Sequence, residues 1–412
     1  MSRMALRGRA AVAAAVAAVI AFGLTMSGDM RRTAAPDPRA RHSTAGVATH
    51  DVTIDDTSQD DTRTVSIEER ADALARAQVS LDSHDALARD RSLDSRDALA
   101  RDSRDALARD TPSLIECRFA ISDIGGTTPK FHCVLSTGIE VRVKYGRGEE
   151  LPAEAAATGL LAALGFGADH ITMVERLRCH GCPKEPFYTM KIVEATRTQR
   201  LYERVLDDES HEDFPWVAME RKFEATAIEA PNQKGWAFHE LDAVDPHRGG
   251  APRAHVDALR LLAVFLAHWD NKADNQRLVC LSKPWPQGTP CREPFLLLQD
   301  VGSTFGPLRL DLEAWERSII WADRATCTVS MRHMPYGGAT FRPIRISEAG
   351  RQFLIKRLGA LSDAHVTGLL SWARFDRHEG LFTHPRPIEE WVRVFKKRVH
   401  TLIDGPPCPD GT

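Results

Sequence analysis

The chain has 412 residues, enough for one large or two ordinary domains, and its 43% hydrophobic and 27% charged residues are typical of a globular protein. The formal net charge is −3. Binding to nucleic acid through charge requires a basic face, so this balance argues against nucleic acid as a partner.

The first 27 residues have the pattern of a secretory signal peptide or an uncleaved signal anchor. Arg3, Arg7 and Arg9 precede an apolar, alanine-rich run over residues 10–26. A positive flank favours the cytoplasmic side of a membrane. We therefore expect a secreted or membrane-anchored protein with its catalytic domain outside the cytoplasm, touching the membrane only through this segment.

Residues 28–112 have the composition of a disordered linker, because they are rich in Asp, Arg, Ser, Thr and Ala and almost lack aromatic residues. They contain the short repeats SLDSHDALARDR, SLDSRDALARD and SRDALARD, which are too short and too polar for a solenoid. A stalk is one interpretation, and a recent repeat expansion without function is another. In either case residues 113–412 are expected to fold alone.

All eight cysteines lie at or after Cys117, and their number fits an oxidising compartment. Cys179 and Cys182 form a CxxC pair, and Cys280 and Cys291 bracket a loop rich in Pro and Gly. A zinc site needs four ligands, for example two CxxC pairs, whereas the sequence has one. We therefore favour disulfides over zinc, with Cys280–Cys291 as the expected bridge and Cys179–Cys182 as a second candidate.

The compact region begins with a β-rich part, residues 113–225. Residues 151–165 have the signals of a helix, with Pro152 and Glu154 in the first turn and Gly165 at the end. Alternating apolar residues predict strands in the segments 114–122, 130–146, 187–195 and 216–225. The prediction is a small β-rich lobe with one helix.

The following part, residues 226–405, has the pattern of a larger α-rich lobe, and residues 406–412 are expected to be a tail. Apolar periodicity predicts helices over 254–269, 346–361 and 388–403, and a buried strand over 294–302. The predicted fold class is therefore α+β with a bilobal arrangement.

The stretch HWDNKADN, residues 268–275, turns polar directly after the apolar run of the predicted helix. Asp270 lies there, and Asp300 ends the predicted buried strand. An unpaired carboxylate beside buried hydrocarbon is costly. Coordination of a cation together with Asn275 would remove this cost for Asp300, and a substrate hydroxyl or Lys272 could do so for Asp270.

Phosphoryl transfer from ATP needs a lysine for the phosphates, a carboxylate that orients the nucleophile, and an Asn and a second Asp that hold the metal. The chain supplies such groups in the order found in protein kinases. Lys144 lies on a predicted strand and Glu154 on the next helix, with Glu150 as an alternative partner for the lysine. Asp270 and Asn275 have the five-residue spacing of a catalytic loop, and Asp300 follows in DVG.

The region from about residue 120 to 305 resembles the HipA-like and phosphatidylinositol 3- and 4-kinase-like branch of the protein-kinase superfamily. GGTTPK (125–130) resembles the phosphate loop of HipA-type kinases, MERKF (219–223) their hinge, and HWDNKADN their catalytic loop. The chain departs from the family in lacking a full G-x-G-x-x-G and in having D-V-G in place of D-F-G. The resemblance implies a bilobal protein-kinase-like fold that uses ATP with Mg²⁺ or Mn²⁺.

The resemblance also implies roles for individual residues. Asp270 and Lys144 would be catalytic, and Asn275 and Asp300 would bind the metal. The cofactor-binding residues would be Lys144, Glu154, Gly125, Gly126, Thr127, Lys130 and Glu220. We expect an exported or membrane-tethered atypical kinase acting on an unidentified protein, glycan or small molecule. A pseudokinase that serves as a nucleotide-binding interaction module, or an AMP-transferring enzyme, is an alternative on the same fold.

Overall fold

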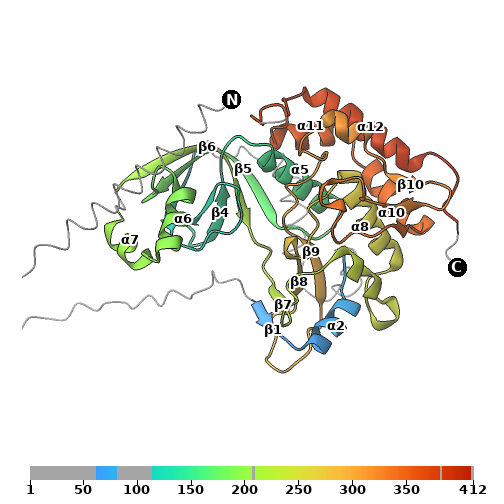
Figure 1. The fold of residues 1–412 in the computed structure, drawn as a ribbon, viewed down its shortest axis with the longest axis horizontal. Helices are drawn as coiled ribbons and strands as arrows, with labels where there is room; N and C mark the ends of the chain where they lie inside the picture. Colours follow the sequence, from blue (N-terminus) through green and yellow to red (C-terminus); the bar gives the residue numbers. More distant parts are fainter. Residues whose placement is uncertain (1–61, 81–113, 207–208, 381–382, 410–412) are drawn as a thin grey trace, which may run out of the picture. The chain divides into compact units, whose positions relative to one another are not determined.

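The computed structural model describes residues 62–80, 114–206, 209–380 and 383–409, all of which belong to one compact unit, residues 56–412. The architecture is mixed α+β, with a closed barrel, a four-stranded sheet, a three-stranded sheet and several helices (Figure 1). The predicted signal segment and the repeats of residues 81–110 lie outside the described residues. Within the described ranges, no helix has the length and apolar character needed to span a membrane.

The barrel is formed by five strands in the order β2-β3-β4-β6-β5. Parallel pairing of β2 with β5 closes it, and its other neighbours pair antiparallel. Alternate side chains such as Phe131, Cys133, Val141 and Val143 point into its core and are buried. The strands are β2 (Ile115–Ala120), β3 (Lys130–Leu135), β4 (Glu140–Lys144), β5 (His170–His180) and β6 (His211–Arg221).

Three helices accompany the barrel, not the one helix that the sequence predicted: α5 (Glu150–Ala163), α6 (Pro186–Thr196) and α7 (Gln199–Val205). The predicted strand over 187–195 is wrong, because these residues form α6. Phe187, Met190 and Val193 recur every three residues, so a helix places them on one face, and all three are buried in the barrel's cluster. Exposed Tyr188 and Ile192 on the other side had given the segment its strand-like pattern.

The four-stranded sheet has the order β1-β7-β8-β9 and contains a segment from far upstream. Its strands are β1 (Thr62–Thr64), β7 (Thr226–Glu229), β8 (Gln276–Cys280) and β9 (Pro294–Leu298). Helix α2 (Ile67–Ala75) follows β1 and lies beside this sheet (Figure 1). The expectation of disorder over 28–112 is therefore wrong for residues 62–80, whose Leu74, Ala77 and Val79 are buried in the main core.

Helices dominate the C-terminal part, and α8 (Arg253–Leu266) lies at its centre with nearly every side chain buried. Arg398 is buried and donates to the carbonyl oxygens of Val264 and Phe265, which satisfies the C-terminal end of α8. The other helices are α9 (Leu312–Arg317), α10 (Glu348–Gly359), α11 (Asp363–Trp372) and α12 (Ile388–Ile403). A small sheet contains β10 (Trp321–Asp323), β11 (Thr328–Val329) and β12 (Ile344–Arg345).

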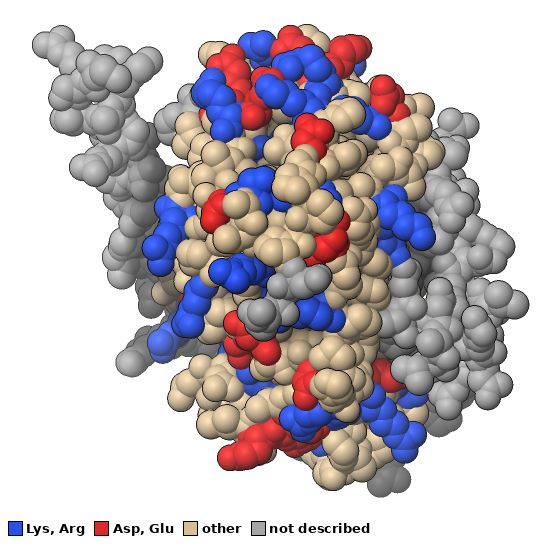
Figure 2. All heavy atoms as spheres, turned by 90° about the vertical axis from the view of Figure 1, so that its right-hand side faces the viewer, with Lys and Arg blue, Asp and Glu red and all other residues tan. Residues whose placement is uncertain are grey.

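Short 3₁₀ helices complete the described secondary structure. They are η2 (Phe238–Ala243), η3 (Pro246–Arg248), η4 (Ala273–Asn275) and η5 (Pro335–Gly337). On the face drawn in Figure 2, Lys and Arg side chains are interspersed with Asp and Glu side chains.

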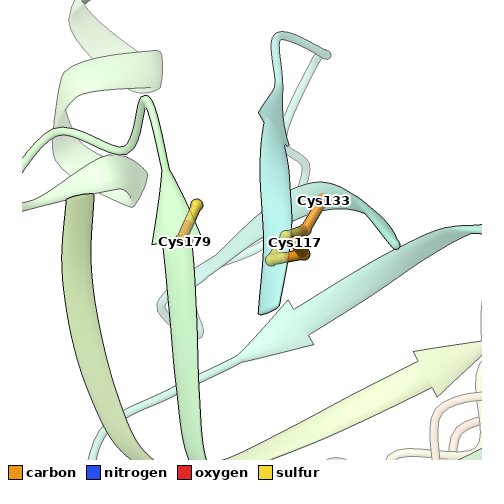
Figure 3. Close-up of side chains that lie close together, drawn as sticks. All are labelled: Cys117, Cys133 and Cys179. Carbon is orange, nitrogen blue, oxygen red and sulfur yellow. A yellow bond between two sulfur atoms is a disulfide. The ribbon is translucent and has the colours of Figure 1, made fainter. Parts of the chain in front are cut away.

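All eight cysteines form disulfides, which fits an oxidising environment. The bridges Cys280–Cys291 and Cys179–Cys182 are those expected from the sequence. Cys117–Cys133 joins β2 to β3, and its sulfur atoms lie within 4.8 Å of the Cys179 sulfur on β5 (Figure 3).

The fourth disulfide, Cys327–Cys408, holds the C-terminal segment in place. The backbone N–H of Cys408 also donates to the Glu348 carboxylate at 2.7 Å. Residues 406–409, which the sequence assigned to a tail, are therefore held in place through Cys408.

Candidate active site

A cavity of about 300 Å³ is lined by residues from the barrel, from the loop before β3 and from the four-stranded sheet. Its wall carries six cationic and six anionic side chains. The cations are Lys130, Arg142, Lys144, Lys222, Lys234 and Arg277, and the carboxylates are Asp123, Glu154, Glu220, Glu229, Asp274 and Asp300. Such a wall suits a ligand that carries phosphate groups and a metal ion.

Lys144, at the end of β4, is the centre of a buried charge network. Its Nζ lies 2.5 and 2.6 Å from the two carboxylate oxygens of Glu154 on α5. Glu220 on β6 lies 3.2 Å from the same Nζ and accepts a hydrogen bond of 2.8 Å from Arg142. Two carboxylates therefore hold one lysine at the cavity wall, and Glu220 is an ion-pair partner of both cations.

Lys144 remains protonated in this network. Burial by itself would lower its pKa, but the charges of Glu154, Glu220 and Asp300 outweigh burial and raise the pKa above its usual value. A fixed positive charge at this point is what a phosphate-binding lysine requires.

Lys130 lies directly opposite Lys144 in the β3–β4 pair and also lines the cavity. Burial lowers the pKa of Lys130, and the charges of Lys144 and Arg142 lower it further. An anion between the two lysines would relieve this repulsion.

The loop before β3 reaches the cavity through Gly125. Gly126 has a φ of +73°, and a Cβ atom there would lie 3.1 Å from Lys130 Nζ, so glycine leaves room for the lysine. Thr127 is exposed, and neither Gly126 nor Thr127 lines the cavity. Of the predicted loop residues, the structure thus brings Gly125 and Lys130 to the cavity.

The stretch 268–275 begins where α8 ends. Ala267 adopts the left-handed conformation, with a φ of 56°, and turns the chain out of the helix. Asn271 is fully buried and donates to the carbonyl oxygen of His268 at 3.0 Å, while its Oδ1 accepts from Thr340. Burial lowers the pKa of His268 to about 4, so this ring is neutral near pH 7. The polar loop therefore rests on a rigid, buried base.

Asn275 and Asp300 lie side by side in the cavity wall. The Asn275 carbonyl oxygen accepts hydrogen bonds from the backbone of Gln299 and Asp300, at 2.9 and 3.2 Å. The Asn275 Nδ2 donates to the Asp270 carbonyl oxygen at 2.7 Å, which leaves Oδ1 as its possible metal ligand. Among the described residues, nothing hydrogen-bonds or ion-pairs with the Asp300 carboxylate. Two hard oxygen donors on neighbouring residues of one cavity wall fit Mg²⁺ or Mn²⁺.

Asp270 is half-buried and does not line the cavity itself. Its carboxylate lies 3.3 Å from Lys272 Nζ, the partner that the sequence had suggested. Its backbone carbonyl oxygen accepts a hydrogen bond of 2.7 Å from Asn275 Nδ2, so Asp270 is held beside one of the metal-binding candidates.

Three polar residues lie near the site without lining the cavity, and of these the sequence named only Glu150, as an alternative partner for Lys144. The structure pairs Lys144 with Glu154 instead. Glu150 accepts a hydrogen bond from Thr128 and pairs with Arg309. A Cβ atom on Gly302 would lie 2.6 Å from the Glu150 side chain, so the glycine of D-V-G leaves room for Glu150. Asp169, buried directly before β5, is near enough to Glu220 for the charge of Glu220 to raise the pKa of Asp169. Arg309 and Asp169 stand in no motif, so the sequence carried no signal for them.

No protein-family model matches the chain, and no curated protein is similar to it. Among solved structures, a Helicobacter pylori proinflammatory kinase, CtkA, is similar at 9% identity, over 70% of this chain and 98% of that chain, with a TM-score of 0.38.

Proposed function

We propose that the protein is an atypical kinase of the HipA-like and phosphatidylinositol 3- and 4-kinase-like branch, which transfers the γ-phosphate of ATP to an acceptor hydroxyl. The observation that carries this proposal is the meeting of the Lys144–Glu154 ion pair with Asn275 and Asp300 at one cavity. These residues come from four separate segments of the chain, and their chemistry matches the parts that phosphoryl transfer requires.

In this proposal, Lys144 and Lys130 bind the phosphates, and Glu154 and Glu220 orient Lys144. Asn275 and Asp300 would hold Mg²⁺ or Mn²⁺, which would supply charge neutralisation at the phosphates when bound. Asp270 orients or deprotonates the acceptor hydroxyl. Its position outside the cavity wall suits a group that faces the acceptor rather than the nucleotide.

The proposed fold is bilobal, with residues 113–225 as the smaller lobe and 226–405 as the larger one. The proposed location is outside the cytoplasm, either exported or membrane-tethered. The signal-like segment over residues 1–27 and the four disulfides support this location. The proposed acceptor is a hydroxyl group of a protein, a glycan or a small molecule.

Transfer of AMP is a second candidate function, and the distribution of cations around the cavity supports it. Lys222, Lys234 and Arg277 also line the cavity, so cations are not confined to the wall around Lys130 and Lys144. A triphosphate bound in the opposite sense would therefore also meet positive charge.

Purified full-length protein with Mn²⁺ and either γ-labelled or α-labelled ATP distinguishes these activities. Label transferred only from the γ-position supports the kinase, whereas label from the α-position supports AMP transfer. Nucleotide binding without transfer from either position, to the protein itself or to added acceptors, would instead assign a nucleotide-binding interaction module. Asp363→Asn on α11 serves as a control, since this exposed carboxylate lies on a helix that does not line the cavity.

A further inference from the structure

Residues 62–80 contribute directly to the wall of the cavity. Strand β1 pairs parallel with β7, in a register that places Thr62 opposite Ala227 and Thr64 opposite Glu229. Val65 N–H donates to the Glu229 carbonyl oxygen at 2.8 Å. Thr62, Ala227 and Glu229 all line the cavity. An upstream strand thus supplies one lining residue and supports two others.

The same segment reaches a second part of the wall through Arg70 on α2. This side chain is 3% exposed and forms an ion pair of 2.9 Å with Glu240. Its Nη2 donates to the carbonyl oxygen of Gly235 at 2.6 Å. Glu240 also accepts a hydrogen bond of 2.7 Å from the backbone N–H of Ala237. The Arg70–Glu240 ion pair therefore fixes the turn after Lys234, which lines the cavity.

Gly235 in turn lies against the loop that carries Asn275. Its φ is +62°, and a Cβ atom there would lie 2.1 Å from the Ala273 carbonyl oxygen and 2.4 Å from that of Gln276. These two residues flank Asn275 on either side. The backbones are therefore in direct contact, and a shift of Gly235 would move the loop that presents Asn275.

Residues 75–78 are held by backbone hydrogen bonds to other parts of the fold. The carbonyl oxygens of Ala75 and Ala77 accept from Asp245 and Ala251, at 2.8 and 3.0 Å. Gln78 exchanges backbone hydrogen bonds of 2.9 Å with Pro294 and Leu296 at β9. Residues 62–80 are therefore held in place by hydrogen bonds to β9 and to the segment 245–251.

We propose that residues 62–80 are part of the nucleotide site, with Thr62 in its wall and Arg70 as a positioning residue for the loop of Asn275. This inference rests on the proposed function, because it assigns to that cavity a metal-nucleotide complex. It leads to two predictions. Loosening Arg70 weakens metal-dependent nucleotide binding, and by reciprocity a bound metal-nucleotide complex stabilises residues 62–80.

The first test uses full-length Arg70→Lys with Mn²⁺ and a non-hydrolysable ATP analogue, measured by calorimetry. Lysine keeps the charge but loses the fork that spans Gly235 and Glu240. Affinity for the analogue with Mn²⁺ should fall about tenfold or more, the usual scale for losing a group that orients a metal ligand. Affinity without metal should change much less, and a general loss of structure would not produce that difference.

Arg248→Lys is the matched control, since its guanidinium contacts Asp72 on the outer side of the same helix and is 51% exposed. It should bind like the parent. Glu240→Gln gives a second variant of the Arg70 contact if Arg70→Lys does not fold. Hydrogen exchange on the unmodified protein needs no variant, and it should show slower exchange over residues 62–80 when Mn²⁺ and the analogue are added.

Two results would overturn the inference while leaving the proposed function intact. One is an Arg70→Lys or Glu240→Gln protein that binds the analogue with Mn²⁺ like the parent. The other is unchanged exchange over 62–80 in a parent protein that binds. A parent protein that binds no nucleotide with Mn²⁺ would instead contradict the proposed function and this inference together.

Discussion

Arg309 and Glu150 join the segment after Asp300 to the first turn of α5, with Nη1 of Arg309 2.9 Å from Oε2 of Glu150. The other carboxylate oxygen of Glu150 accepts from Thr128, in the loop that contains Gly125 and leads to Lys130. Arg309 itself has a φ of 60°, and a non-glycine residue in this region is strained unless its surroundings fix it. Through its two carboxylate oxygens, Glu150 on α5 thus connects the loop before β3 with the segment that follows D-V-G.

We predict that Glu150 and Arg309 stabilise the fold through their mutual interaction, so that the effects of mutating them are not additive. In a double-mutant cycle with Glu150→Gln and Arg309→Gln, the coupling in the free energy of unfolding should be about 1 kcal/mol, because both side chains are partly buried. Urea unfolding measures it. The exposed pair Arg147–Glu379 is the matched control and should show almost no coupling. Equal coupling in the two cycles would mean that Glu150–Arg309 is an ordinary surface contact.

Removing either metal-ligand candidate should abolish metal-dependent nucleotide binding. Asp300→Ala and Asn275→Ala each delete one oxygen donor at the cavity, and neither opens a large apolar void. Calorimetry with Mn²⁺ and ATP should show no binding, while thermal melts stay close to that of the parent. Asp274→Ala, which removes another lining carboxylate from the same loop, should retain binding. Full binding by Asp300→Ala or Asn275→Ala would show that the metal assignment is wrong.

Asp270→Asn should separate catalysis from nucleotide binding. The change removes the charge and proton affinity of the carboxylate at nearly constant shape, so turnover should fall by roughly 10²-fold or more. Nucleotide affinity should barely change, because Asp270 does not line the cavity. Lys144→Ala should weaken both binding and turnover, since Lys144 faces the phosphates in the proposed site. Steady-state rates and calorimetry on both variants test this, and normal turnover by Asp270→Asn would remove Asp270 from the mechanism.

The buried carboxyl of Asp169 predicts a pH dependence of stability. Burial raises its pKa to about 6, the charge of Glu220 adds to this, and a hydrogen bond from Phe223 N–H opposes it. A raised folded-state pKa stabilises the fold below the unfolded pKa near 4, and this contribution is lost as pH rises through about 6. The loss by pH 7 is up to about 3 kcal/mol.

Asp169→Asn should therefore flatten this part of the stability profile, because Asn retains the acceptor for Phe223 but cannot ionise. Urea unfolding between pH 4 and pH 7 measures the profile. An unchanged slope in the variant would mean that another group titrates in this range.

The packing of α2 into the main core can be tested at one residue. Leu74→Ala should reduce the free energy of unfolding by about 2–4 kcal/mol, because Leu74 is 4% exposed and its removal leaves a cavity. Ile67→Ala on the same helix is the control and should change stability by less than about 0.5 kcal/mol, since Ile67 is 51% exposed. Equal, small effects would mean that residues 62–80 do not pack stably in solution.

The sequence alone determined the elements whose signals are local. The apolar periodicity over 388–403 predicted α12 at the bounds that the structure has, and the run over 254–269 predicted α8. The short spacings of Cys280–Cys291 and Cys179–Cys182 were enough to expect both disulfides. Neighbouring residues carry this information because helix periodicity and short loop closure involve few intervening residues.

Only the tertiary structure decided which distant segments meet. The segment 62–80 has few apolar residues among many polar ones, so its composition predicted disorder. Its apolar residues Val65, Leu74 and Val79 are stabilised by burial against a sheet whose other strands lie about 150 to 230 residues later in the chain. Arg70 with Gly235, Arg309 with Glu150, and Cys117–Cys133 beside Cys179 likewise depend on long-range packing. Such contacts leave no periodic trace, because their partners are selected by the folded arrangement of the chain and not by neighbours in sequence.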